Sequence, residues 1–125
     1  MAGGRDFDKQ KTADRDMRMA FVKVCVAGDV PLDMGFRVDQ GPEPIAIFNL
    51  DGEFFAIGDT CTHSDWPLSE GYIEDGQVEC TLHMARFCIR TGKVKAAPAT
   101  EAVKYYPVKR EGDDILVDIE GGAYA

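Results

Sequence analysis

The stretch CTHSDWPLSEGYIEDGQVECTLH, residues 61–83, contains two of the four cysteines and both histidines of a 125-residue chain. Each half of the stretch pairs a cysteine with a histidine that follows it closely, Cys61 with His63 and Cys80 with His83. The segment between the halves contains Asp75-Gly76, which favours a two-residue β-turn and therefore a hairpin. Because a hairpin brings its flanking segments together, we expect two ligand-bearing loops to lie side by side.

The rest of the sequence has the pattern of short strands separated by turns. PIAIFNLDGEFFAIGD, residues 44–59, is two apolar runs around Asp51-Gly52, and residues 103–120 contain a further pair of strands around REGDD. In AFVKVCVAGDV, residues 20–30, a period of two predicts that Val22, Val24 and Val26 share one face. No stretch has the pattern of a long amphipathic helix. The sequence therefore predicts an all-β sandwich or barrel.

Composition and length indicate one folded domain with a tail. Residues 1–18 are polar and aperiodic, which predicts a mobile N-terminal tail before a domain over residues 19–125. A net charge of −8 argues against nucleic acid or an anionic membrane as a partner. The sequence lacks the apolar run of about 18 residues that a membrane span needs, and its start lacks the apolar core of a secretory signal. We therefore expect a cytoplasmic protein.

The four cysteines divide into two kinds. Cys25 and Cys88 lie in alternating apolar runs, where cysteine is typically a small buried hydrophobe. Cys61 and Cys80 lie near histidines, which in a reducing compartment favours a metal site or a nucleophile over a disulfide. Cys61 and Cys80 are therefore the cysteines whose function has to be explained.

Four interpretations compete for these two cysteines and two histidines. A structural zinc site is chemically possible, but such sites usually space their ligands differently from Cys-x-His and Cys-x-x-His. A thiolate nucleophile with a histidine base needs one cysteine and one histidine, so the second pair stays unexplained. Unligated structural residues do not account for the use of both histidines in one pattern. The remaining interpretation is a [2Fe–2S] cluster in which two cysteines bind one iron and two histidines the other.

This spacing resembles the Rieske motif, C-x-H…C-x-x-H. The longer stretch CTHSDWPLSEGYIEDGQVECTLHMARFCIRTGKVKAAPA, residues 61–99, is similar to the cluster region of Rieske ferredoxins. The ferredoxins it resembles serve dioxygenases that hydroxylate aromatic rings such as biphenyl, cumene or naphthalene. The similarity extends over about residues 19–120. The resemblance implies an antiparallel β-sandwich of three small sheets, with the cluster at one tip. It also implies that Cys61 and Cys80 bind the buried iron, and that His63 and His83 bind the outer one.

The resemblance further implies that the protein is an electron carrier and not an enzyme. It would pass single electrons from an NADH-dependent flavoprotein ferredoxin reductase to the terminal oxygenase of a ring-hydroxylating dioxygenase, in the catabolism of aromatic compounds. Once four ligands are assigned, no histidine remains as a general base. The alternatives are the Rieske-type small subunit of a nitrite reductase or a monooxygenase system, and a structural zinc-binding interaction module.

Comparison with high-potential Rieske proteins indicates a low potential here. Those proteins have an extra cysteine in each cluster loop, at positions that match Trp66 and Leu82, and hydroxyl donors at positions that match Ala85 and Phe87. Hydrogen bonds to cluster sulfur stabilise the negative charge that reduction adds, so the missing donors lower the potential. We expect a value near the bottom of the Rieske range of about −150 to +300 mV.

Three apolar residues of the cluster region form a possible docking rim, Trp66, Met84 and Pro98. They either cover the cluster from water or surround the histidines where a partner docks. Four basic residues follow the second loop and either form a solvated face or steer a partner, namely Arg86, Arg90, Lys93 and Lys95.

Overall fold

The computed structural model describes residues 20–62, 64–81, 84–97 and 99–125. The predicted tail, residues 1–18, lies outside the described residues. Two short 3-10 helices, η2 (Ala27–Asp29) and η3 (Leu68–Glu70), interrupt a succession of strands. The strands are β1 (Phe21–Val26), β2 (Gly35–Val38), β3 (Ile45–Leu50), β4 (Glu53–Gly58), β5 (Tyr72–Glu74), β6 (Gln77–Glu79), β7 (Arg86–Cys88), β8 (Val94–Ala96), β9 (Tyr105–Tyr106), β10 (Val108–Glu111) and β11 (Asp114–Asp118). Within the described ranges, no helix has the length and apolarity that crossing a membrane requires.

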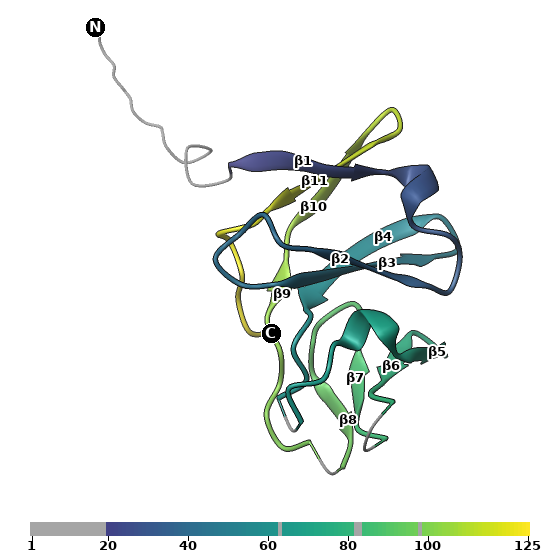
Figure 1. The fold of residues 1–125 in the computed structure, drawn as a ribbon, viewed down its shortest axis with the longest axis vertical. Coiled ribbons are helices and arrows are strands. Elements are labelled where there is room, and N and C mark those ends of the chain that lie inside the picture. Colours follow the sequence, from purple (N-terminus) through teal and green to yellow (C-terminus); the bar gives the residue numbers. More distant parts are fainter. Residues whose placement is uncertain (1–19, 63, 82–83, 98) are drawn as a thin grey trace, which may run out of the picture.

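The strands form three antiparallel sheets stacked along the long axis of the molecule (Figure 1). The outer three-stranded sheet has the order β1-β11-β10, and the central sheet has the order β2-β3-β4-β9. The third sheet, β5-β6-β7-β8, lies at the opposite end of the molecule from β1. This architecture confirms the predicted antiparallel sandwich of three small sheets.

The predicted hairpins are present, and their turns have the backbone conformation that two-residue hairpins favour. Asp51 and Gly52, between β3 and β4, have φ angles of 54° and 93°. Asp75 and Gly76, between β5 and β6, have φ angles of 54° and 73°. Asp-Gly tolerates this left-handed conformation because glycine has no Cβ and aspartate enters the region more readily than most residues. The Asp-Gly turn therefore sets the strand register of each hairpin.

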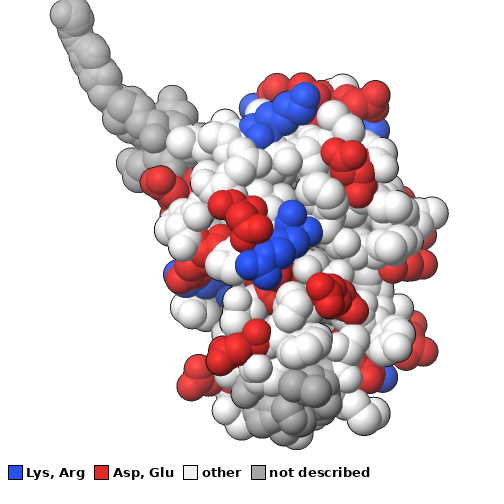
Figure 2. Space-filling view, viewed as in Figure 1, with Lys and Arg blue, Asp and Glu red and all other residues white. Residues whose placement is uncertain are grey.

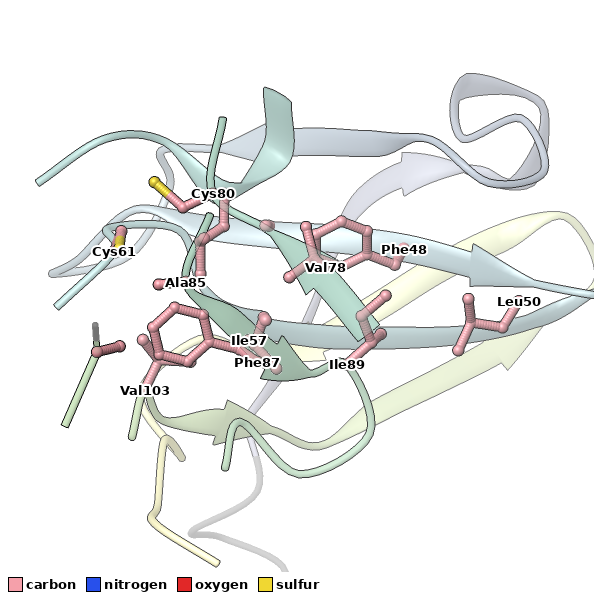
Figure 3. Packing of buried hydrophobic residues seen from close by; sticks show 13 residues of the cluster. Phe48, Leu50, Ile57, Cys61, Val78, Cys80, Ala85, Phe87, Ile89 and Val103 are labelled. Atoms are coloured by element: carbon pink, nitrogen blue, oxygen red, sulfur yellow. The ribbon is translucent and has the colours of Figure 1, made fainter. Parts of the chain in front are cut away.

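Every residue of β3 is buried, because the central sheet separates two hydrophobic cores. Ile45 and Ile47 face the core shared with the outer three-stranded sheet, named here the upper core. Ala46, Phe48 and Leu50 face the core shared with the third sheet, named here the lower core. The lower core also contains Ile57, Cys61, Leu68, Val78, Cys80, Ala85, Phe87, Ile89, Ala99 and Val103, most of which are shown in Figure 3.

Strand β1 departs from the predicted alternation. Its pairing with β11 shifts register between Lys23 and Cys25, which is a β-bulge at Val24. Val24 and Cys25 both pack against the upper core as a result. The prediction that Val22, Val24 and Val26 share one face is therefore wrong across the bulge, because the extra residue changes the side to which the following residues point.

A buried carboxylate links the end of β4 to η3 and β2. Asp59 has no exposed surface, and its Oδ1 accepts a hydrogen bond of 2.7 Å from the backbone N–H of Ser69. Its Oδ2 accepts a hydrogen bond of 3.0 Å from Nη1 of Arg37, and its backbone oxygen accepts one of 2.6 Å from the N–H of Leu68. The chain between Asp59 and η3 contains Cys61, so this carboxylate anchors both ends of that segment.

We predict that Asp59→Ala lowers the free energy of unfolding by about 2 kcal/mol. The change leaves the N–H of Ser69 without its acceptor, whereas Arg37 is half exposed and retains its ion pair with Asp39. Denaturant unfolding of the metal-loaded protein measures the effect. Asp39→Ala removes an exposed partner of the same arginine and should change stability by less than about 0.5 kcal/mol. Equal losses in the two variants would contradict the anchoring role.

Candidate metal centre

Cys61 and Cys80 lie at the same end of the lower core. Neither residue has any exposed surface, and neither forms a disulfide. Figure 3 shows both sulfurs at one end of the core, with Ala85 beside them and Leu50 at the other end. Eighteen residues, 62–79, separate these two cysteines in the chain, and the fold brings them together. The predicted meeting of two cysteine-bearing loops is therefore observed.

The first cysteine loop, residues 61–66, is closed by a bridge and two backbone hydrogen bonds. An isolated β-bridge pairs Thr60 with Pro67 at its base. The N–H of Cys61 donates to the oxygen of Trp66 at 2.9 Å, and the N–H of Asp65 donates to the oxygen of Cys61 at 2.9 Å. Asp65 has a left-handed φ of 61°, which turns the chain back toward the bridge.

The second cysteine loop, residues 80–85, has the same closure. Glu79 of β6 pairs with Arg86 of β7 at its base. The N–H of Cys80 donates to the oxygen of Ala85 at 2.8 Å, and the N–H of Met84 donates to the oxygen of Cys80 at 2.9 Å. Met84 has a left-handed φ of 62°. Each cysteine is thus the first residue of a six-residue loop that is closed by the same two backbone hydrogen bonds.

Two side-chain contacts join the first cysteine loop to its neighbours. The Oγ of Ser64 lies 3.3 Å from the Sγ of Cys80 in the second loop. The Oγ1 of Thr62 donates a hydrogen bond of 2.6 Å to the backbone oxygen of Glu101. Sequence reasoning missed both residues. Their only signal was their position beside His63, and no pattern shows which way a loop side chain points.

The other predicted site residues divide between described and undescribed positions. His63, Leu82, His83 and Pro98 lie outside the described residues. Trp66 and Met84 lie in the two cysteine loops and are 41% and 66% exposed. Ala85 and Phe87 are fully buried and carry no hydroxyl. Among the described residues, no three histidine, cysteine, aspartate or glutamate side chains lie close enough to bind a metal.

The match to known proteins extends over most of the chain. Residues 20–107 match the protein family described as "Rieske [2Fe-2S] domain". This chain belongs to the Rieske family. It is 58% identical, over 104 residues, to the "Biphenyl 2,3-dioxygenase, ferredoxin component" of Rhodococcus jostii strain RHA1, covering 83% of this chain and 97% of that protein.

Two solved structures share the fold of this Rieske chain. The "Sphingomonas yanoikuyae B1 ferredoxin" is 32% identical with a TM-score of 0.74, over 78% of this chain and 97% of that one. A chain of the "Complex of reduced oxygenase and oxidized ferredoxin in carbazole 1,9a-dioxygenase" is 31% identical with a TM-score of 0.73. That match covers 79% of this chain and 93% of the other. Membership of the family implies one Rieske [2Fe–2S] cluster.

The described residues fit such a cluster. Thiolate is a preferred ligand of iron–sulfur clusters, and two unbridged cysteine sulfurs lie at one end of an apolar core. Burial in that core keeps water away from the sulfurs, whereas five other residues of the loops are exposed, namely Thr62, Asp65, Trp66, Thr81 and Met84. A Rieske site also needs two histidines, and the sequence places His63 and His83 inside the same two loops.

The four basic residues near the Rieske site do not form one free patch. The Nε of Arg86 donates a hydrogen bond of 3.1 Å to Glu79, and Arg90 lies 3.6 Å from Glu53. Arg90 also stacks on the ring of Phe55, 4.7 Å from its centroid. Arg86 and Arg90 therefore form ion pairs with acidic neighbours. Lys93 and Lys95 are exposed.

The remaining cysteines lie away from the cysteine loops. Cys25 is buried in the upper core, and burial raises the pKa of its thiol to about 11, so the expectation of a small buried hydrophobe is confirmed. Cys88 is only half-buried, which makes the same expectation wrong there. It begins a third turn with the same closure, in which its N–H donates to Lys93 and its oxygen accepts from Gly92. That turn contains no histidine and lies at the other end of β7 from the second cysteine loop.

We predict that Cys88→Ser leaves the iron and sulfide content of the purified protein unchanged. Serine retains the small polar side chain in the third turn, and the turn is separate from both cysteine loops. Cys80→Ser is the matched comparison and should lose most of the cluster, because a hydroxyl is a poor substitute for a thiolate on iron. Iron and acid-labile sulfide per chain measure both. Loss of iron from the Cys88 variant would show that a ligand had been misassigned.

Proposed function

We propose that this chain is the ferredoxin component of an aromatic-ring dioxygenase system in the cytoplasm. It is a low-potential carrier that takes single electrons from an NADH-dependent flavoprotein reductase and passes them to the terminal oxygenase. The observation that supports this most directly is the identity to the Rhodococcus ferredoxin component along nearly its whole length. In this proposal the domain that performs this role is residues 19–125.

The cysteine loops support an assignment of the four ligands. In this proposal Cys61 and Cys80 hold one iron, and His63 and His83 hold the other. The bound cluster supplies a reversible one-electron couple. The chain contributes two loops closed by backbone hydrogen bonds, and an apolar core that excludes water from the sulfurs. Rigid ligands favour electron transfer, because little structure has to move when the charge changes.

The surface supports a transient encounter with the partners. Trp66 and Met84 are exposed next to the ligand positions, and with Pro98 they would form an apolar docking rim. The chain has 22 acidic and 14 basic side chains, and Figure 2 shows acidic side chains spread over the face in view. Complementary charge speeds encounter, whereas a small apolar contact lets the carrier leave again. The solved carbazole dioxygenase complex pairs a ferredoxin with an oxygenase.

Spectroscopy of the purified protein tests the cluster before any partner is needed. We expect a broad visible absorption band and, after reduction with dithionite, the anisotropic low-g electron spin resonance signal of a histidine-ligated [2Fe–2S] centre. The carrier role is then tested by adding an NADH-dependent ferredoxin reductase and a biphenyl-type terminal oxygenase. NADH-dependent turnover of the oxygenase should require this chain. A colourless protein with stoichiometric zinc would overturn the proposal and favour a structural zinc module.

We predict that His83→Cys retains four ligands but lowers the reduction potential. A thiolate adds negative charge beside the iron, which makes addition of an electron less favourable. A spectroscopic redox titration of the loaded variant measures the shift. An unchanged potential would count against His83 as a ligand.

We predict that Trp66→Ala slows electron transfer to the oxygenase roughly tenfold, as expected for an exposed aromatic at the centre of an interface. The cluster absorbance should stay close to that of the unmodified protein, since the side chain is 41% exposed. Stopped-flow mixing of reduced ferredoxin with oxidised oxygenase measures the rate. Leu32→Ala is the control, because Leu32 is 59% exposed and lies outside both cysteine loops. Equal rates for both variants would contradict a docking role for Trp66.

A further inference from the structure

We propose that the hydroxyl of Ser64 donates a hydrogen bond to the Sγ of Cys80 and thereby raises the reduction potential of the bound cluster. The proposal rests on the proposed function, because it takes Cys80 as an iron ligand. It makes Ser64 a positioning residue of the redox site, although Ser64 is itself no ligand.

The contact joins the two cysteine loops. The Oγ of Ser64, in the first loop, lies 3.3 Å from the Sγ of Cys80, in the second loop, and the pair is partly buried. A distance of this size suits a hydroxyl–sulfur hydrogen bond, since sulfur is larger than oxygen. The partner of Ser64 is therefore the sulfur of the opposite loop.

Iron binding decides the direction of this hydrogen bond. A free cysteine and a serine can each donate to the other. A cysteine that binds iron does so as a thiolate and has no proton on its sulfur. Ser64 must then be the donor and Cys80 the acceptor. A hydrogen bond to a charged acceptor is also stronger than one between neutral groups.

Two further hydrogen bonds lie close to Ser64 in the first cysteine loop. Ser64 lies within the turn in which the N–H of Asp65 donates to the oxygen of Cys61. Two residues earlier in the chain, the Oγ1 of Thr62 is bonded to the backbone oxygen of Glu101. Ser64 therefore lies between two residues, Thr62 and Asp65, that are each hydrogen-bonded.

The consequence for the potential follows from the charge that reduction adds. When an external reductant supplies one electron, the ligand sulfurs gain negative charge, and a donor aimed at them stabilises the reduced state more than the oxidised one. Ala85 and Phe87 offer no hydroxyl from the second loop or β7. Ser64 instead supplies a donor from the first loop, so it partly offsets the low potential expected from those two residues.

The test compares Ser64→Ala with Ser64→Thr in the cluster-loaded, full-length protein. Alanine removes the donor with little change in volume, whereas threonine retains a hydroxyl at the same position. We expect Ser64→Ala to lower the affinity for the electron about tenfold, which corresponds to about 59 mV in a one-electron couple. Ser64→Thr should retain most of the wild-type potential. A redox titration reports on loaded molecules only, so partial loading of a variant does not obscure the result.

A second readout detects the proton itself. Pulsed electron nuclear double resonance of the reduced protein, exchanged into D₂O, should show an exchangeable deuteron near the cluster that disappears in Ser64→Ala. An alanine variant with the wild-type potential, or with the deuteron signal intact, would overturn the proposal. So would a threonine variant that behaves like alanine. Absence of any reversible one-electron couple in the wild-type protein would instead overturn the proposed function, so the two failures are distinguishable.

Discussion

Strand β3 has no face toward water, and the rest of the structure depends on this constraint. Its alternate side chains supply two different cores, Ile45 and Ile47 to one and Ala46, Phe48 and Leu50 to the other. A slip of one residue would exchange the two sets, so the register with β4 is strongly determined. The same strand thereby fixes the sheets on both sides. The two cysteines of the candidate metal centre lie in the lower core, to which this strand contributes.

Each of the two cysteines comes shortly after a strand, and the two strands belong to neighbouring sheets. Cys61 leaves the central sheet at the end of β4, and Cys80 leaves the third sheet at the end of β6. Both enter a six-residue loop with the same two backbone hydrogen bonds. The fold thus brings the two cysteines to one end of the lower core from strands of different sheets.

Local chemistry made part of this fold predictable. Asp51-Gly52 and Asp75-Gly76 determine their turns from two neighbouring residues, so both hairpins could be predicted from the sequence. The meeting of Cys61 and Cys80 could also be predicted, because the hairpin at Asp75-Gly76 lies between them. The bulge at Val24 and the burial of Asp59 could not be predicted from the sequence. Each depends on partners far along the chain, Ile115 for the bulge and Arg37 with Ser69 for the carboxylate.

The contact between Ser64 and Cys80 shows why a potential is harder to predict than a ligand set. The net charge of −8 disfavours an added electron, but surface charges in water are screened beyond about 8 Å at physiological ionic strength. A hydrogen bond of 3.3 Å inside a partly buried loop is screened much less. The few donors that touch the sulfurs therefore outweigh the many distant carboxylates. Which donors those are depends on the direction of single side chains in two loops, and the motif does not give that direction.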